Sequence, residues 1–343
     1  MNNILDSEDP DFVILSSFPS LKVMDLILID SIDGDLITGE NTFLTNSTKY
    51  LDVVVKPLVE RGLRWASTYG NHDSQYNLSR PALFAEESKY SLSYTSTTPS
   101  ISGITNYYLP LYPAKENCDP VAILWFFDSR GGAPFQADPD SASIPNWVTP
   151  DIVSWFTAEK EVVRAKWGEL PSLAFVHIPP TAFLTVQQTT LPNTGEESKN
   201  FPGLNDDVPL AAEGDGTEDV PFMQALANTS GLHSVYSGHD HGDAWCGLWP
   251  NVTGVHIGED AAGVNRNGPF LCFCKHTGYG GYGNWNRGAR NLRLRFREEK
   301  GLEGMEVESW VRMENGEIVQ RVGLNETYGS DVYPMEDGEN YIV

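Results

Sequence analysis

Cysteine is scarce in this chain, and its spacing excludes two common kinds of small scaffold. The 343 residues include only four cysteines, at Cys118, Cys246, Cys272 and Cys274. Four are too few for a fold built on disulfides, and there is no Cys-x-x-Cys pair or Cys/His finger to predict a structural zinc module. A disulfide from Cys246 to Cys272 or Cys274 is compatible with the sequence, and so is a set of buried free thiols.

Long apolar runs and positive charge are also lacking. No stretch reaches the ~18 apolar residues that a membrane-spanning helix needs. Lys and Arg total 23 against 47 Asp and Glu, which gives a formal net charge of −24. A nucleic-acid-binding protein would show a basic stripe, and an anionic membrane would repel this charge. We therefore expect neither nucleic acid nor membrane as a partner, and the acidity mainly indicates solubility.

The first residues lack the basic start and apolar middle of a secretory leader. We expect the chain as given to be cytoplasmic, and secretory or vacuolar only if its true start lies further upstream. Five Asn-x-Ser/Thr sequons hint at a secretory ancestry; they begin at Asn46, Asn77, Asn228, Asn251 and Asn325.

Histidine is scarce too, which makes its placement informative. Only seven occur, and three of them fall in the tetrapeptides Gly70-Asn71-His72-Asp73 and Gly238-His239-Asp240-His241. A Gly34-Asp35 pair precedes them, and His177 ends an apolar run between them. Carboxylate and amide oxygens suit hard divalent cations, and imidazole suits zinc, iron or manganese. Two such ions can hold a hydroxide and clamp a phosphate.

The pattern of apolar residues predicts an α/β protein. Helical spacing is expected over residues 41–60, with Gly62 as the C-cap, and over 149–167 and 220–227. Strands are expected at 11–15, 25–30, 65–69, 121–127, 173–178, 234–237, 254–257, 270–274, 292–296 and 306–313. This order favours two mixed β-sheets packed as a sandwich with flanking helices. Each Asp, Asn or His motif follows a strand, and active sites of α/β sheets lie at such carboxyl ends.

Each of these residues has a simpler interpretation when taken alone. Asp35 would be a turn residue, and His177 would be a packed core histidine. The run from Gly238 to His241 could be a solvated turn. Arg130, just after a predicted strand, could contact a substrate or lie in a surface turn. Their order, spacing and shared position at strand ends favour a single metal site instead.

In order, Gly34-Asp35, Gly70–Asp73, Val176-His177 and Gly238–His241 resemble the last four signatures of the calcineurin-like metallophosphoesterases. Together with a late glycine-rich run at 275–287, they are most similar to a fungal branch related to plant purple-acid-phosphatase-like enzymes. The resemblance implies the family's four-layer fold, with the two sheets at its centre. It also implies hydrolysis of phosphate esters, on small molecules or phosphoproteins, through a metal-bound hydroxide.

The resemblance implies a metal-binding role for five residues, namely Asp35, Asn71, His177, His239 and His241. Asp35 would bridge two ions. Asn71, His177 and His239 would complete one ion, and His241 would bind the other. His72 would face the phosphate and protonate the leaving oxygen, with Asp73 orienting its ring. The two ions would be iron, zinc or manganese. The family's coloured tyrosine ligand is replaced by Thr38, so no tyrosinate-to-iron colour is expected.

The chain departs from the family pattern at its start. The family opens with an Asp-x-His motif that supplies ligands to the first metal, whereas the first histidine here is His72. We expect the family's first strand to be missing and residues 16–33 to be an insertion, or else a genuine surface loop. A third alternative is that the run at 25–30 replaces the apolar strand that in the family leads directly into Gly-Asp.

We therefore expect a single domain over residues 1–343, with the family resemblance confined to 34–300. The second metal site should be complete and the first incomplete. The alternative function is a catalytically impaired or non-catalytic remnant of the same fold.

Overall fold

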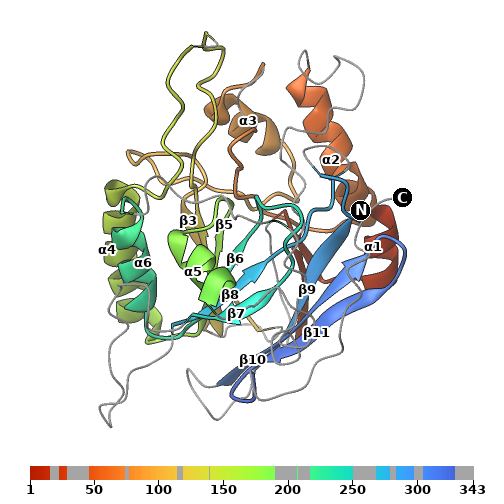
Figure 1. Ribbon diagram of the computed structural model, residues 1–343, viewed down its shortest axis with the longest axis vertical. Coiled ribbons are helices and arrows are strands. Elements are labelled where there is room, and N and C mark those ends of the chain that lie inside the picture. The colour runs from red at the N-terminus through yellow and green to blue at the C-terminus, as the bar shows by residue number, and fades with distance from the viewer. Residues whose placement is uncertain are drawn as a thin grey trace.

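The chain folds into four layers, with two β-sheets packed face to face between two groups of helices (Figure 1). The computed structural model describes residues 1–15, 23–28, 46–73, 77–113, 119–138, 140–189, 207, 217–249, 268–278, 283–296 and 304–328. The predicted α/β class, with two mixed sheets and flanking helices, is confirmed. Asp35, Cys118 and the strand predicted at 254–257 lie outside the described residues.

The larger sheet has six strands in the order β3-β4-β5-β6-β8-β7. Their bounds are β3 Tyr107–Leu111, β4 Ala122–Phe127, β5 Ser172–Val176, β6 Leu232–Ser237, β7 Cys246–Leu248 and β8 Phe270–Phe273. The four central strands β4, β5, β6 and β8 run parallel, and the edge strands β3 and β7 are antiparallel to their neighbours. The carboxyl ends of the four central strands therefore lie along one edge of the sheet.

The smaller sheet has five strands in the order β1-β2-β9-β10-β11. Their bounds are β1 Phe12–Ile14, β2 Val23–Leu28, β9 Gly288–Phe296, β10 Met305–Met313 and β11 Ile318–Leu324. Strand β2 pairs with β1 on one side and with β9 on the other. It falls within the segment 16–33 that the sequence suggests as an insertion, so this segment contributes a strand to the sheet. The domain boundaries and the origin of the segment stay predictions.

Among the described residues, six helices flank the sheets, with the bounds α1 Asn2–Glu8, α2 Ser47–Arg61, α3 Arg80–Glu87, α4 Pro150–Trp167, α5 Thr181–Thr189 and α6 Val220–Ala227. Helix α2 starts where the side chain of Asn46 accepts a hydrogen bond from the Lys49 amide. It ends at Gly62 as predicted, because the φ of 67° there favours glycine. No helix among the described residues is long and apolar enough to cross a membrane.

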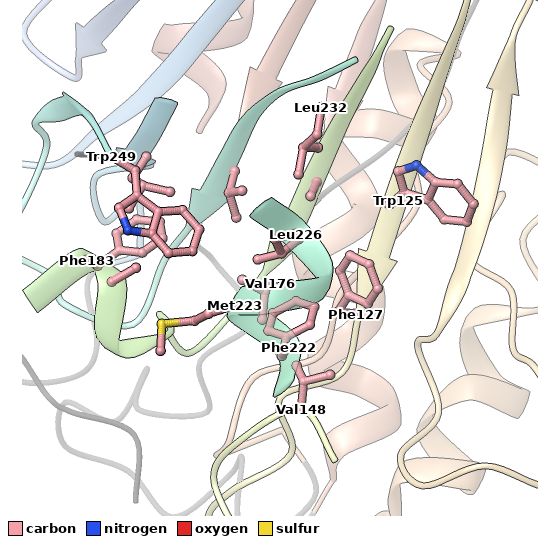
Figure 2. Close-up of a cluster of buried hydrophobic side chains, with 14 of the residues drawn as sticks. Trp125, Phe127, Val148, Val176, Phe183, Phe222, Met223, Leu226, Leu232 and Trp249 are labelled. Carbon is pink, nitrogen blue, oxygen red and sulfur yellow. The ribbon is translucent and has the colours of Figure 1, made fainter. Parts of the chain in front are cut away.

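Strand β4 shows how the sequence specifies the layers. All six of its residues are buried, and alternate side chains point to opposite faces of the sheet. Leu124 and Phe126 pack between the two sheets. Trp125 and Phe127 pack against α4 and α6 on the other face, where Phe127 meets the ring of Phe222 edge-on at 4.9 Å (Figure 2). Burial on both faces is typical of a central parallel strand.

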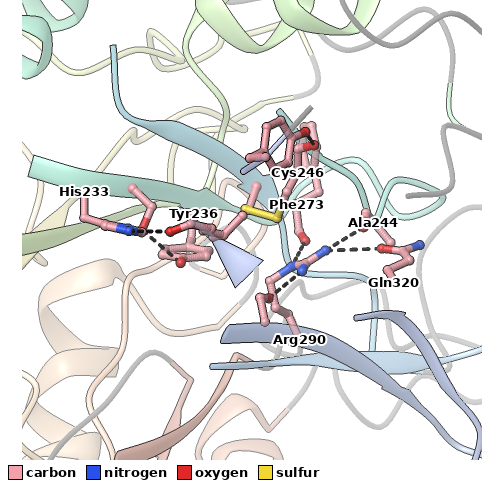
Figure 3. The surroundings of a disulfide bond; sticks show 12 residues. His233, Tyr236, Ala244, Cys246, Phe273, Arg290 and Gln320 are labelled. Atoms are coloured by element: carbon pink, nitrogen blue, oxygen red, sulfur yellow. Dashed lines mark hydrogen bonds between the residues drawn. A yellow bond between two sulfur atoms is a disulfide. The ribbon is translucent and has the colours of Figure 1, made fainter. Parts of the chain in front are cut away.

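A disulfide and a buried arginine join the later strands (Figure 3). Of the alternatives open from the sequence, the structure has the Cys246–Cys272 disulfide between β7 and β8, with Cys274 a buried free thiol. Arg290 on β9 is fully buried and donates to the backbone carbonyls of Phe273 and Ala244 at 2.6 and 2.5 Å. The guanidinium thus ties the five-stranded sheet to the segment that follows the Gly-His-Asp-His motif.

The pH dependence of stability should report on His233, which lies on β6 and donates from Nε2 to the carbonyl of Leu324 at 3.0 Å. Burial lowers the pKa of His233 from 6.5 to about 4. The unfolded chain therefore takes up this proton more readily. The stability that the neutral ring provides is complete above pH ~6.5 and is lost as the pH falls toward 4.

We expect the free energy of unfolding to drop by about 2–3 kcal/mol from this group between pH 7 and pH 4.5. Urea denaturation of the wild type and of His233→Gln at both pH values measures the difference. Equal losses in the two proteins would show that His233 is not responsible.

Candidate metal centre

The candidate site lies along the carboxyl edge of the six-stranded sheet. The segment expected to be a strand at 65–69 makes two isolated parallel bridges, Leu15 with Ser67 and Trp65 with Ser93. It leads directly into the Gly-Asn-His-Asp motif. Thr68 joins this segment to the sheet by donating from its hydroxyl to the carbonyl of Phe127 at 2.8 Å. The first histidine motif therefore starts beside the end of β4.

Hydrogen bonds of side-chain hydroxyls and of the backbone link the neighbouring strand ends to one another. The amide of Ile178, after β5, donates to the hydroxyl of Ser129, after β4, at 3.0 Å. The hydroxyl of Ser237 at the end of β6 donates to the carbonyl of His177 at 2.6 Å. The amide of Cys274, after β8, donates to the carbonyl of Ser237 at 2.9 Å. These bonds set the relative positions of the loops before any ligand is considered.

A buried ion pair holds the loop that carries Asn71. Arg80 donates to Asp128 at 3.2 Å and to the carbonyl of Gly70 at 2.9 Å. The two side chains are 8% and 0% exposed. Within the loop, the amide of Gly70 donates to the carboxylate of Asp73 at 2.6 Å. Asp73 therefore closes the loop on itself, and its expected role toward His72 stays a prediction.

Two glycines allow a second loop to pack on Asn71. A Cβ at Gly132 would lie 1.9 Å from the backbone oxygen of Asn71, and one at Gly131 would lie 3.0 Å from the Asn71 Cβ. Both glycines also have positive φ, at 82° for Gly131 and 74° for Gly132. Only glycine both lacks the Cβ that would clash with Asn71 and readily adopts a positive φ. Arg130 precedes them with a left-handed φ of 61°; its contact with a substrate stays a prediction.

Three of the predicted ligands come together at this edge. Asn71 Oδ1 lies 3.0 Å from His177 Nε2, and both residues are buried. The ring of His239 lies 5.3 Å from that of His177, centroid to centroid, and nearly perpendicular to it at 79°. An amide oxygen and two imidazoles therefore converge from three different strand ends.

His239 reaches this position through a strained turn. Its φ is 68°, and the amide of Asp240 bonds to the carbonyl of Gly238 at 2.8 Å across it. A γ-turn with positive φ is rare, and such strain is concentrated at functional sites. The motif therefore forms a tight turn at His239.

His241, the remaining predicted ligand that the structure describes, faces another histidine. Its ring stacks on that of His276, with centroids 3.7 Å apart and planes 9° from parallel. The sequence suggests only a structural role for His276. Asp35, the predicted bridging ligand, is outside the described residues.

The donors that converge suit a transition-metal ion. Two cis ligands that each lie ~2.1 Å from one ion are about 3 Å apart, which is the separation of Asn71 Oδ1 and His177 Nε2. Imidazole nitrogens with an amide oxygen match zinc, iron or manganese. Within the described part of the chain, no three His, Cys, Asp or Glu side chains form a group able to hold an ion.

Several charged residues that support the site are not predicted from the sequence. Arg80 and Asp128 are described above. Asp243 is also fully buried, and it accepts from Gln187 Nε2 at 2.9 Å. Burial, reinforced by the charge of Asp240, raises the pKa of Asp243 well above its ordinary value. The one available signal is position: Asp128 directly follows the strand predicted at 121–127, and Asp243 lies two residues after His241.

Comparison with known proteins confirms the class of protein that the motifs predict: the chain is related to the calcineurin-like metallophosphoesterases. No family model matches the sequence. Probable inactive purple acid phosphatase 29 of Arabidopsis thaliana is 23% identical over 84% of this chain and 72% of its own length. Phosphatase DCR2 of Saccharomyces cerevisiae is 25% identical over 72% of this chain and 38% of its own.

Probable inactive purple acid phosphatase 28 of Arabidopsis thaliana is 24% identical over 91% of this chain and 76% of its own. Among solved structures, a dimetal phosphatase from Danio rerio has a TM-score of 0.46 at 14% identity, covering 84% of this chain and 81% of that one.

Removing the buried carboxylate should destabilise the protein strongly. Asp128→Ala leaves the guanidinium of Arg80 buried without its counter-charge, so we expect a loss of about 3–5 kcal/mol in the free energy of unfolding. Lys56→Ala is the matched control, because it breaks the exposed Lys56–Glu60 pair at 3.7 Å and should cost no more than about 0.5 kcal/mol. Urea denaturation measures both. Similar values for the two variants would mean that the buried pair does not hold these loops.

Proposed function

We propose that the chain is a metal-dependent phosphoesterase that hydrolyses phosphate esters. The observation that carries the proposal is the convergence of Asn71, His177 and His239 at the carboxyl edge of a parallel sheet. The relationship to a named phosphatase supports the same chemistry. The substrate class is a phosphate ester, on a small molecule or a phosphoprotein.

The proposed division of labour follows the positions of the residues. Asn71, His177 and His239 would complete one ion, His241 would bind the other, and Asp35 would contribute to both. Bound ions of iron, zinc or manganese would supply Lewis acidity toward the phosphate and lower the pKa of a water molecule. The tight packing of the Gly131-Gly132 turn on Asn71 orients the amide toward His177, so this donor pair is preorganised.

His72 is the proposed general acid. It directly follows Asn71 and is partly exposed, so it can reach a phosphate ester that binds at the edge of the site. A proton donated to the leaving oxygen avoids the expulsion of a poor, charged leaving group. Asp73 accepts a hydrogen bond from the Gly70 amide and would thereby help to keep His72 at this position.

A specific pair of observations favours a second candidate function, a non-catalytic remnant of the fold. No Asp-x-His motif precedes Gly34 in this chain, and two of the relatives above carry the word inactive in their names. The two candidates are separated by hydrolysis of p-nitrophenyl phosphate with added manganese or zinc. Turnover that Asn71→Ala and His239→Ala abolish supports the enzyme. A wild-type protein that binds these ions without turnover supports the remnant.

The acid role of His72 predicts a substrate-dependent defect. His72→Ala should keep the wild-type metal content, measured by plasma emission spectroscopy, because the side chain is not a proposed ligand. Turnover should slow by about 10²–10⁴-fold on an alkyl phosphate. The defect should be smaller on p-nitrophenyl phosphate, because nitrophenolate leaves without needing a proton. Equal defects on both substrates, or no defect on either, would rule out the acid role.

A further inference from the structure

We infer that His276 is a positioning residue of the metal centre, whose ring sets the plane of the His241 imidazole without binding the ion itself. The inference rests on the proposed metal-dependent function and adds a residue that the family resemblance does not assign.

The sheet topology brings the two histidines to the same place. Strands β6 and β8 are parallel neighbours, with Ser237 opposite Phe273 in the register. The pairing continues one residue further, where the Cys274 amide donates to the Ser237 carbonyl at 2.9 Å. His241 and His276 follow these paired residues on adjacent loops. Their meeting is therefore a consequence of the central part of the sheet and not of a long surface excursion.

The contact between the rings is face to face and excludes water. The centroids are 3.7 Å apart, the planes are 9° from parallel, and the residues are 1% and 2% exposed. A ring held flat against a second ring cannot rotate about its χ2 without losing the contact. The plane of His241, and with it the direction of its in-plane nitrogen lone pairs, is restricted by this stack.

His276 is itself anchored to the second sheet. Its carbonyl accepts from the amide of Gly288, at the start of β9, at 3.0 Å, and the hydroxyl of Thr277 donates to the carbonyl of Gly288 at 2.6 Å. On the other side, Lys275 turns the chain with φ 64° and donates from Nζ to the carbonyl of Gly242 at 3.2 Å. The stacking ring therefore belongs to a rigid support that also holds the loop of its partner.

The same geometry argues against His276 as a ligand of the ion that His241 would hold. Imidazole binds metal through a nitrogen lone pair that lies in the plane of the ring. The two rings are nearly parallel and 3.7 Å apart, so their lone pairs lie in two separate planes and cannot meet at one ion. Residues outside the ligand set commonly fix the orientation of a ligating histidine, through hydrogen bonds to its second nitrogen. Here the ring face of His276 supplies that restriction.

Three substitutions separate a positioning role from ligation. His276→Phe keeps a flat ring but has no nitrogen, His276→Leu fills the space without a flat ring, and His241→Ala removes the proposed ligand. Manganese and zinc binding to the full chain is measured by equilibrium dialysis with plasma emission spectroscopy. Urea denaturation checks that each variant is folded. The ion that His241→Ala fails to bind is the one that His241 holds in the wild type.

We expect His276→Leu to lower the affinity for that same ion by about 10–100-fold. His276→Phe should retain the wild-type affinity. Asn71→Ala should lose the other ion and leave this one in place. Loss of the ion in His276→Phe as well as His276→Leu would show that a His276 nitrogen ligates, which overturns the inference. Wild-type affinity in His276→Leu would also overturn it, while the proposed function stands. A wild-type chain that binds neither metal would overturn both, and one whose metal content His241→Ala leaves unchanged would overturn the inference alone.

Discussion

The arrangement of the candidate site depends on the carboxylate of Asp128, which is fully buried at the end of β4. It accepts hydrogen bonds from Arg80 and from the backbone amides of Arg130 and Ile104. A buried ion pair gains little net stability, because desolvation offsets most of the attraction between the charges. Its value here is geometric. One carboxylate joins three chain segments, and the arginine that it orients reaches the carbonyl of Gly70, next to Asn71.

A second buried guanidinium holds loop backbone in the same way. Arg290 bonds to the carbonyl of Ala244, three residues after His241, and to that of Phe273, three residues before His276. Both arginines thus hold loops by their backbone carbonyls. Such anchoring uses backbone groups of the loops and not the side chains of the proposed ligands. It also explains how a turn with φ 68° at His239 can persist, since the flanking backbone is held from both sheets.

The elements that could be predicted from the sequence are those whose burial pattern is local. Helix α6 has its predicted bounds. Strand β4 begins only one residue later than expected; it could be predicted because a run of six buried residues leaves few alternatives. Strand β3 escapes prediction because Pro110 argues against a strand, although an edge position tolerates it. Arg80 and His276 escape for a different reason. Their importance comes from partners far away in sequence, which no local pattern encodes.

The relatives do not decide between the two candidate functions, because function depends on the site and not on the fold. At 23–25% identity they include a named phosphatase and proteins named as probable inactive ones. The residues themselves divide the site into two halves. In the half built on Asn71, His177 and His239, the proposed ligands lie together, and hydrogen bonds of 2.6–3.0 Å join the strand ends that carry them. The other half depends on His241 and on the segment that contains Asp35. Activity therefore turns on whether this second half can hold an ion, and the stacked pair of histidines is the described part of the chain that bears on that question.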